Sequence, residues 1–330
     1  MRKNPIRIVV IGGGTGLSTL LRGLKNFPFD ITAIVTVADD GGSSGRLRDN
    51  YDIPPPGDVR NVIAALSDVE PLIEEMFQYR FEQSDDLKGH SLGNLMLAAL
   101  TDITGDFSYA ISEMSRVFQV NGHVVPAANK KVTLHAELID GTTIVGESKI
   151  PDAQVPIKRI TLEPENVKPL PAAIRAIERA ELIVLGPGSL YTSIIPNLLV
   201  KEIREAILCA KAPKLYICNL MTQLGETIGY NAEAHIKAVH DHVGKPFIDA
   251  VLVNDLEQSQ LLKTLCSIGQ VKPVTYDEHR LEDLGIKVIK KDIAMIREGT
   301  LCHQATVVAQ WMYEYMIREN KISRNKSRVL

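Results

Sequence analysis

The stretch IRIVVIGGGTGLSTLLRGL, residues 6–24, decides the fold. Ile6 to Ile11 form an apolar, β-branched run interrupted only by Arg7, which is typical of a parallel strand buried on both faces. Glycines follow at once, and four leucines at positions 17, 20, 21 and 24 then recur at helical spacing. Ile31 to Val37 form a second buried strand, so these residues predict a βαβ unit with a right-handed crossover.

The same alternation returns in the second half of the chain. Strands are predicted at Leu182–Leu185, Leu215–Cys218 and Ile248–Val253, and helices at Ile195–Cys209 and Ala232–His242. We therefore expect a three-layer, Rossmann-like α/β fold whose sheet is mainly parallel. Residues 1–330 are expected to form a single large domain.

Two segments depart from this alternation. A helical block is predicted from Asp58 to Phe118, and a small antiparallel β-hairpin insertion at about 120–163. Within the insertion, Val132–Leu138 and Thr143–Ile150 alternate around Asp140-Gly141, a strong hairpin turn signal. Residues 320–330 carry four basic side chains and no acid, which indicates a flexible basic tail.

Composition excludes several classes of protein. Hydrophobic residues make up 45% of the 330, charged residues 23%, and the net charge is −3, so we expect a globular protein that does not bind nucleic acid. No apolar run approaches the roughly 20 residues of a membrane span, and the start is too short and glycine-rich for a secretion signal. The cysteines (Cys209, Cys218, Cys266, Cys302) form no C-x-x-C pair, which favours scattered buried thiols in the cytoplasm.

The first candidate binding loop is Gly12-Gly13-Gly14-Thr15-Gly16, between the first strand and the first helix. Glycines allow close approach of the backbone to a phosphate, and the helix N-terminus supplies free N–H groups. The loop is neither a G-x-G-x-x-G fingerprint, since Leu17 stands where glycine is needed, nor a Walker loop. A plain strand-to-helix turn is the alternative, but phosphate or nucleotide contact is favoured.

The second loop, Asp39 to Arg48, follows the second strand. Asp39 stands about 20 residues beyond the glycines, where a ribose-binding acid is expected. Ser43 and Arg46 would close over an anion from a mobile glycine loop, whereas Asp40 beside Asp39 would repel a diphosphate unless both face sugar hydroxyls or share a cation. A flexible surface loop with incidental charge is the alternative.

Two more loops flank the helical block. In PPPGDVRN, Asp58 is predicted as the N-cap of the following helix, ahead of a ligand role, and Asn61 lies three residues on. In GHSLGN, Ser91 is predicted to cap the next helix, with His90 and Asn94 presented near its start. His90 is a poor general base because no nucleophile is apparent beside it.

The last two loops follow later strands. Gly186-Pro187-Gly188-Ser189 precedes Thr192 and Ser193, and Asn219 precedes Thr222. The carboxyl ends of parallel strands share one rim, so we expect these loops to enclose a single anionic small molecule.

Two further features are interpreted as structural. In His240-Asp241-His242 the alternate side chains of a helix point apart, which favours exposed surface over a metal site. Trp311, Met312, Tyr315 and Met316 recur at helical spacing, which favours core packing.

The strings GGGTGLS, VTVADDGGSSGRLR, PPPGDVRN, GHSLGN, GPGSLYTS and CNLMTQLGET occur in this order over about residues 5–250. In this combination the chain resembles the bacterial gluconeogenesis-factor family, relatives of 2-phospho-L-lactate transferase. The resemblance implies a cytoplasmic protein that binds a nucleotide-sugar such as a UDP-sugar and acts in growth and cell shape on gluconeogenic carbon sources. In the transferase relatives two acids hold a metal, and Asp40 and Asp58 are the positions here that answer to them; the surrounding strings differ.

Three hypotheses follow. The first is a regulatory protein that binds a uridine nucleotide-sugar, has no catalytic residue, and passes its occupancy to a protein partner through an ordered glycine loop. The second is a transferase of phosphorus-containing groups with Mg²⁺ on Asp40 and Asp58. The third, an NAD-dependent redox enzyme, rests only on the glycine loop and Asp39. We also expect a homo-oligomer.

Overall fold

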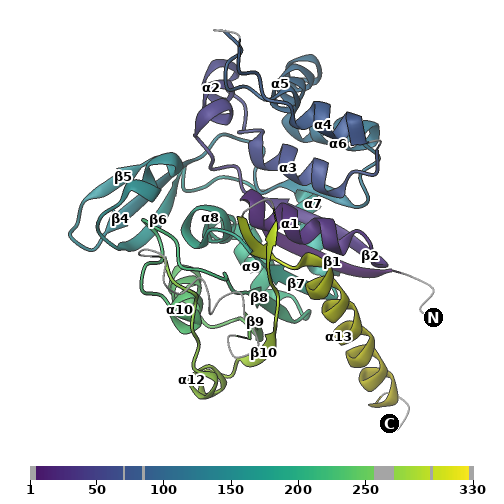
Figure 1. Cartoon of the computed structure of the whole chain (residues 1–330), viewed down its shortest axis with the longest axis vertical. Coiled ribbons are helices and arrows are strands. Elements are labelled where there is room, and N and C mark those ends of the chain that lie inside the picture. Colours follow the sequence, from purple (N-terminus) through teal and green to yellow (C-terminus); the bar gives the residue numbers. More distant parts are fainter. Residues whose placement is uncertain (1–4, 70, 84–85, 256–270, 298–299, 327–330) are drawn as a thin grey trace.

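The computed structural model describes residues 5–69, 71–83, 86–255, 271–297 and 300–326 (Figure 1). The predicted α/β fold is confirmed, because the chain builds a seven-stranded sheet in which every pairing is parallel. The strand order is β10 (Lys287–Lys291), β9 (Ala250–Asn254), β8 (Lys214–Ile217), β7 (Leu182–Leu185), β1 (Ile6–Gly12), β2 (Phe29–Val35) and β3 (His123–Pro126). From β1 the chain first builds the sheet outward through β2 and β3, and later returns to the other side of β1 with β7. The strand order therefore reverses between β1 and β7, which is where ligands bind in open α/β sheets.

Helices cover both faces of this sheet and complete the three predicted layers (Figure 1). One face packs on α1 (Gly14–Leu24), α3 (Gly57–Leu66), α4 (Pro71–Gln78), α5 (Leu92–Thr104), α6 (Phe107–Val117) and α13 (Ala305–Lys326). The other face packs on α7 (Pro171–Arg179), α8 (Ile195–Leu199), α9 (Lys201–Cys209), α10 (Ala232–Val243) and α12 (Glu278–Asp283). Helix α2 (Gly42–Tyr51) occupies most of the second candidate loop, Asp39 to Arg48, so the prediction that Ser43 and Arg46 lie on a glycine loop is wrong.

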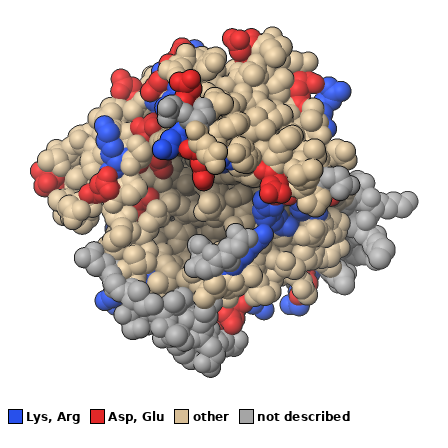
Figure 2. Space-filling model, turned by 45° about the horizontal axis from the view of Figure 1, so that its top comes forward, with Lys and Arg blue, Asp and Glu red and all other residues tan. Residues whose placement is uncertain are grey.

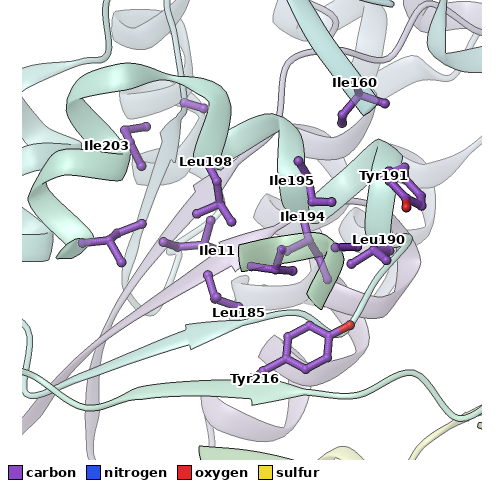
Figure 3. Packing of buried hydrophobic residues seen from close by; sticks show 14 of the residues in the cluster. Ile11, Ile160, Leu185, Leu190, Tyr191, Ile194, Ile195, Leu198, Ile203 and Tyr216 are labelled. Carbon is purple, nitrogen blue, oxygen red and sulfur yellow. The ribbon is translucent and has the colours of Figure 1, made fainter. Parts of the chain in front are cut away.

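The loop after β7 is positioned by a tightly packed part of the core. Ile11, Leu185 and Tyr216, on three neighbouring strands, lie beneath Leu190–Ile194 and α8, and all of them are buried (Figure 3). Each such aliphatic side chain contributes about 1.5–3 kcal/mol on burial. Residues 190–194 form a π-helical turn that leads into α8. The single helix predicted at Ile195–Cys209 is in fact two helices, α8 and α9, which meet at Val200.

The antiparallel part is smaller than the predicted insertion. β4 (Thr133–Leu138), β5 (Thr143–Val145) and β6 (Ile157–Glu163) form a three-stranded antiparallel sheet that projects from the body (Figure 1). The boundary predicted near residue 120 is wrong, because β3 lies inside the predicted insertion but extends the main sheet in parallel. A 3₁₀ helix, Glu147–Asp152, replaces the end of the second predicted strand.

Three smaller expectations also need correction. His242 is buried, not exposed, and its Nε2 accepts from the backbone N–H of Ile160 at 3.0 Å. Cys209 is exposed, whereas Cys218 is buried, and Cys266 lies outside the described residues. Helix α13 continues to Lys326, past the predicted start of the tail at residue 320, and residues 327–330 lie outside the described part. The packing role of Met312 and Met316 is confirmed.

No helix within the described ranges is long and apolar enough to cross a membrane, in agreement with the sequence.

Helix α13 packs on α1 at a position that only glycine permits. A Cβ atom on Gly23 would lie 2.4 Å from the carbonyl oxygen of Ala305. We expect Gly23→Ala to lower the free energy of unfolding by about 1–3 kcal/mol through overpacking. This loss should occur although alanine is the better helix former, and urea unfolding measures it. Ser18→Ala on the same helix is the control, and equal stability of both variants would contradict the packing argument.

Candidate functional site

The predicted loops meet at the carboxyl edge of the sheet, beside β1. Gly188 lies against Gly13, since a Cβ built on Gly188 would be 3.2 Å from the Gly13 carbonyl oxygen. The amide N–H of Gly188 also points to Oδ1 of Asn219 at 3.4 Å. A Cβ on Gly16 would lie 2.7 Å from the carbonyl oxygen of Pro187. Loops far apart in the sequence therefore form one crevice wall.

A cavity of about 670 Å³ opens on this wall, in the size range of small-molecule sites. Figure 2 shows the hollowed face of the molecule, with both Lys or Arg and Asp or Glu atoms around the hollow. The predicted residues that line the cavity are Thr15, Gly16, Gly188, Asn219 and Thr222. The cavity is therefore built from the ends of β1, β7 and β8 together.

The N-terminus of α1 lies in this wall and has the properties of an anion seat. Its N-cap residue, Gly13, has no side chain to satisfy the first amide groups. Gly14 adopts a φ of +65°, a conformation that glycine takes at little cost. Arg22 and Arg297 line the same cavity and add positive charge; Arg22 also pairs with Glu74 at 2.7 Å. The amide groups of this turn and the two guanidinium groups together suit a phosphate-bearing ligand, although the Asp58 carboxyl already accepts from the backbone of Gly14.

Next to the cavity, five carboxyl groups form what we call the acid cluster: Asp39, Asp40, Asp58, Glu147 and Glu226. Oδ1 of Asp40 accepts from the N–H of Ser148 at 2.8 Å, which ties the residues after β2 to the 3₁₀ helix Glu147–Asp152. Oδ1 of Asp39 accepts from the N–H of Gly41 at 2.9 Å. The acid cluster thus collects groups from four separate segments of the chain.

Asp58 does not cap its own helix, so that prediction is wrong. Helix α3 begins at Gly57 without a side-chain cap, and Asp58 lies in its first turn. Its carboxyl group instead points to α1, where it accepts from the backbone of Gly14 and would be 2.5 Å from a Cβ on Gly13. Asp58 therefore holds the N-termini of two helices together.

The acid cluster changes the protonation of its own members. Burial, followed by the charge of Asp39, raises the pKa of Asp58 to about 7. Burial, followed by the charges of Asp39, Asp58, Asp40 and Glu226, raises the pKa of Glu147 to about 8. Burial also raises the pKa of Glu226 to about 7, although the hydrogen bonds that Tyr191 and Thr192 donate to this carboxyl group act to lower it. The cluster is therefore partly protonated near neutral pH, and protons or a cation relieve its repulsion.

The predicted metal ligands fit Mg²⁺ in chemistry, as two carboxylates to which a phosphate-bearing ligand would add further oxygens. Carboxylate oxygens such as those of Asp40 and Asp58 are the donors that Mg²⁺ prefers. Within the described ranges, however, no three His, Cys, Asp or Glu side chains are gathered so that they could hold a metal ion.

A second polar group ties α2 to α5. The hydroxyl of Ser43 accepts from Nδ2 of Asn94 at 3.0 Å and lies 2.9 Å from Nδ1 of His90. Since the amide of Asn94 is the donor, the Ser43 hydroxyl is free to donate to an unprotonated Nδ1, and burial, followed by Arg46 and Arg80, lowers the pKa of His90. All three residues are buried, and Ser91 caps α5 as predicted. This group is a hydrogen-bonded support beside the site.

We expect Ser43→Ala to lower the free energy of unfolding by about 1–3 kcal/mol, because it leaves two buried polar groups without a partner. Denaturant unfolding of Ser43→Ala, Asn94→Ala and the double variant measures the coupling between them. Strict additivity of the two single losses would show that the hydrogen bond contributes nothing.

The remaining predicted residues lie around the crevice rather than in the cavity lining. The guanidinium of Arg46 donates to the carbonyl of Lys88 at 2.5 Å, and Oδ1 of Asn61 accepts from Arg60 at 2.9 Å.

The residues after β7 also contact the protein itself. Ser189 accepts from Gln223 at 2.8 Å, Thr192 donates to Glu226 at 3.2 Å, and Ser193 faces Gly14. Gly12 accepts from the backbone of Thr36, and Gly186 has a φ of +80°. Their contacts shape the loops.

Sequence reasoning missed two groups of residues at the crevice. Ser18, Thr19 and Arg22 lie on the exposed side of α1, at the helical spacing that already identified its buried side. Arg297 and Leu301–His303 come from β11 (Ala294–Arg297) and β12 (Thr300–His303), an antiparallel hairpin more than 270 residues from Gly16 in the sequence. No local sequence pattern predicts that this hairpin contacts the cavity.

Comparison with known proteins agrees with this architecture. The profile of the family described as "2-phospho-L-lactate transferase CofD" matches residues 8–294. The "Gluconeogenesis factor" of Bacillus subtilis (strain 168) is 54% identical over 310 residues, which cover 94% of this chain and 98% of that protein. The protein of the same name from Halalkalibacterium halodurans is 55% identical over 307 residues, with coverages of 93% and 95%.

A solved structure is similar over nearly the whole chain. A crystal structure of a Bacillus halodurans protein superposes with a TM-score of 0.90 at 54% sequence identity, and covers 94% of this chain and 100% of that one. A second crystal structure, described as a member of the UPF0052 family, gives a TM-score of 0.89.

Proposed function

Since the chain belongs to the CofD family, we propose that its crevice binds a nucleotide-sugar, such as a UDP-sugar, and that the protein is a regulator that senses this ligand. The observation that supports this most is the N-terminus of α1, whose N-cap residue Gly13 has no side chain, in the wall of a cavity of about 670 Å³. Amide groups there suit a diphosphate, and the cavity continues to side chains that suit hydroxyl and base groups.

In the proposed complex the diphosphate lies on the Gly14–Gly16 turn and against Gly188. Thr15 and Thr222 would donate hydrogen bonds, and Arg22 and Arg297 would supply the positive charge that we first expected from Arg46. Asn219 would face a sugar or base hydroxyl. Asp39, on the side of the acid cluster, would accept from the sugar.

The relatives named gluconeogenesis factors suggest where this binding matters. We propose that the protein is needed for growth and normal cell shape on gluconeogenic carbon sources, and that it acts in the cytoplasm through a protein partner. The Gly41–Gly42 turn that opens α2 would transmit occupancy, because it is hydrogen-bonded to Asp39. A homo-oligomeric assembly is part of this proposal.

Thermal unfolding with UDP-sugars, UDP and NAD tests the proposal. A ligand at 100 times its dissociation constant adds about 2.7 kcal/mol to the free energy of unfolding. We expect UDP-sugars to stabilise the protein without a metal and to remain intact on long incubation. Stabilisation by NAD alone would overturn the proposal in favour of a dinucleotide enzyme.

A second candidate function is a transferase of phosphorus-containing groups, and the acid cluster is the observation that favours it. Its mutual repulsion would be relieved by Mg²⁺ on Asp40 and Asp58. In that case stabilisation by the nucleotide ligand should require Mg²⁺, and Asp58→Asn should remove the requirement. Metal-independent binding of an intact ligand would exclude this candidate.

A further inference from the structure

A second cavity lies at the opposite, amino-terminal end of the strands. It has a volume of about 710 Å³, also within the range of small-molecule sites. Its floor is formed by the amino-terminal halves of β1 and β2, as far as Val9 and Thr32, and by β3 with Val125. We call it the amino-end groove. None of its lining residues belongs to the crevice cavity.

Two helices from opposite faces of the sheet, α6 and α7, both contact the edge strand β3 and line the amino-end groove, each with one stripe of side chains. On α7 the stripe has the spacing i, i+3, i+4, i+7 of a single helix face: Ala172, Arg175, Ala176 and Arg179. On α6 it is Ser108, Ser112, Ser115 and Arg116. One side therefore presents guanidinium groups and the other presents hydroxyl groups.

The positive charge of the groove is not balanced by its own acids. Arg7 pairs with Glu181 at 3.5 Å, Arg116 pairs with Glu113 at 2.9 Å, and His123 is 4.0 Å from Asp30. Arg175 and Arg179 are exposed, and no ion pair or side-chain hydrogen bond engages either of them in the part of the chain that the structure describes. Like charges one helical turn apart disfavour the helix unless something neutralises them.

We propose that the amino-end groove binds a small organic phosphate, with the phosphate on Arg175 and Arg179 and the carbon skeleton on the apolar floor. Arginine is the residue best suited to bidentate phosphate recognition, and serine hydroxyls can donate to the ligand from the facing helix. The valines beneath leave room for a sugar or base ring rather than for a bare ion.

The shape and charge of the groove argue against two other occupants. It extends across three neighbouring strands, β1, β2 and β3, so a compact molecule fits it better than an extended peptide along one strand edge. A second copy docked through the same groove about a two-fold axis would bring the unpaired arginines of both copies together, and like charges across an interface are unfavourable.

Calorimetric titration at moderate salt tests the proposal with AMP, fructose 1,6-bisphosphate and inorganic phosphate as probes. We expect at least one organic phosphate to bind at one molecule per chain with a dissociation constant below about 1 mM, and inorganic phosphate to bind at least about tenfold more weakly. The combined change Arg175→Glu and Arg179→Glu should weaken that binding by at least about tenfold.

Two control variants distinguish binding in the groove from a general effect of net charge and from binding in the crevice. Lys211→Glu with Lys245→Glu makes the same change in net charge at exposed positions outside the groove and should leave binding intact. Gly16→Ala, which forces apart the two loops of the crevice wall, should also leave binding in the groove intact. The proposal is overturned if no organic phosphate binds, if the Lys pair reduces binding as much as the Arg pair, or if Gly16→Ala abolishes it. It is also overturned if Arg175→Glu with Arg179→Glu changes the mass of the oligomer in solution but does not weaken the binding of the organic phosphate.

Discussion

Gly16→Ala is expected to abolish binding in the crevice, with a loss of affinity of at least about 100-fold, or about 2.8 kcal/mol. The added methyl group would lie 2.7 Å from the carbonyl oxygen and 2.9 Å from the carbonyl carbon of Pro187, both of them backbone atoms that cannot rotate away. The α1 turn and the Pro187–Gly188 loop must then move apart. Those two loops form the proposed diphosphate seat, so its amide groups lose their common geometry.

Gly12→Ala is the matched control for this result. A Cβ on Gly12 meets Leu17 at 3.7 Å, an ordinary van der Waals distance, although the two glycines belong to the same loop. Titration with a UDP-sugar should therefore show near-normal affinity for Gly12→Ala and none for Gly16→Ala. Equal affinities for the two variants would mean that the ligand does not sit on this turn.

The second large effect is a pH dependence that comes from the acid cluster. The stability of the free protein should fall as the pH rises from 7 to 8.5. The folded-state pKa of Glu147, about 8, exceeds its ordinary value of 4.5, so the folded chain keeps a proton that the unfolded chain has lost. Such a group contributes stability below its unfolded pKa, and this contribution is lost as the pH rises through its folded pKa.

The slope has an upper limit of about 1.4 kcal/mol per pH unit for each proton retained. Asp58 and Glu226, each with a pKa of about 7, have lost much of their protonation at the start of this window, so Glu147 dominates. Burial lowers the pKa of His303 to about 4, so this side chain is neutral in the folded protein throughout the pH window.

Urea unfolding at several pH values measures this slope, and Glu147→Gln should flatten it and stabilise the protein at pH 8.5. Glu282→Gln, on the exposed side of α12, is the control. A slope that survives Glu147→Gln would place the titrating group elsewhere. Nucleotide-sugar affinity should also rise as the pH falls from 8.5 to 7, because protonation of the cluster removes negative charge beside the diphosphate.

The parallel fold could be predicted because its signals are local. A buried strand such as Ile6–Ile11 is read directly as an apolar β-branched run, and the leucine spacing after it identifies the buried side of α1. Boundaries were less accurate, as β3 shows: the segment around His123 has little pattern of its own and joins the main sheet through pairing with Thr32 and its neighbours. Pairing partners are a property of the folded chain.

The candidate site divides in the same way. By itself, the sequence determined that glycine and polar loops follow buried strands, which brings Thr15, Gly188 and Asn219 to one edge because the carboxyl ends of parallel strands are neighbours. Only the tertiary structure decided that Asp58 turns away from its own helix to α1, and that Glu147 and Arg297 arrive from distant segments. Charge interactions depend on distance through space, and a linear sequence does not contain that distance.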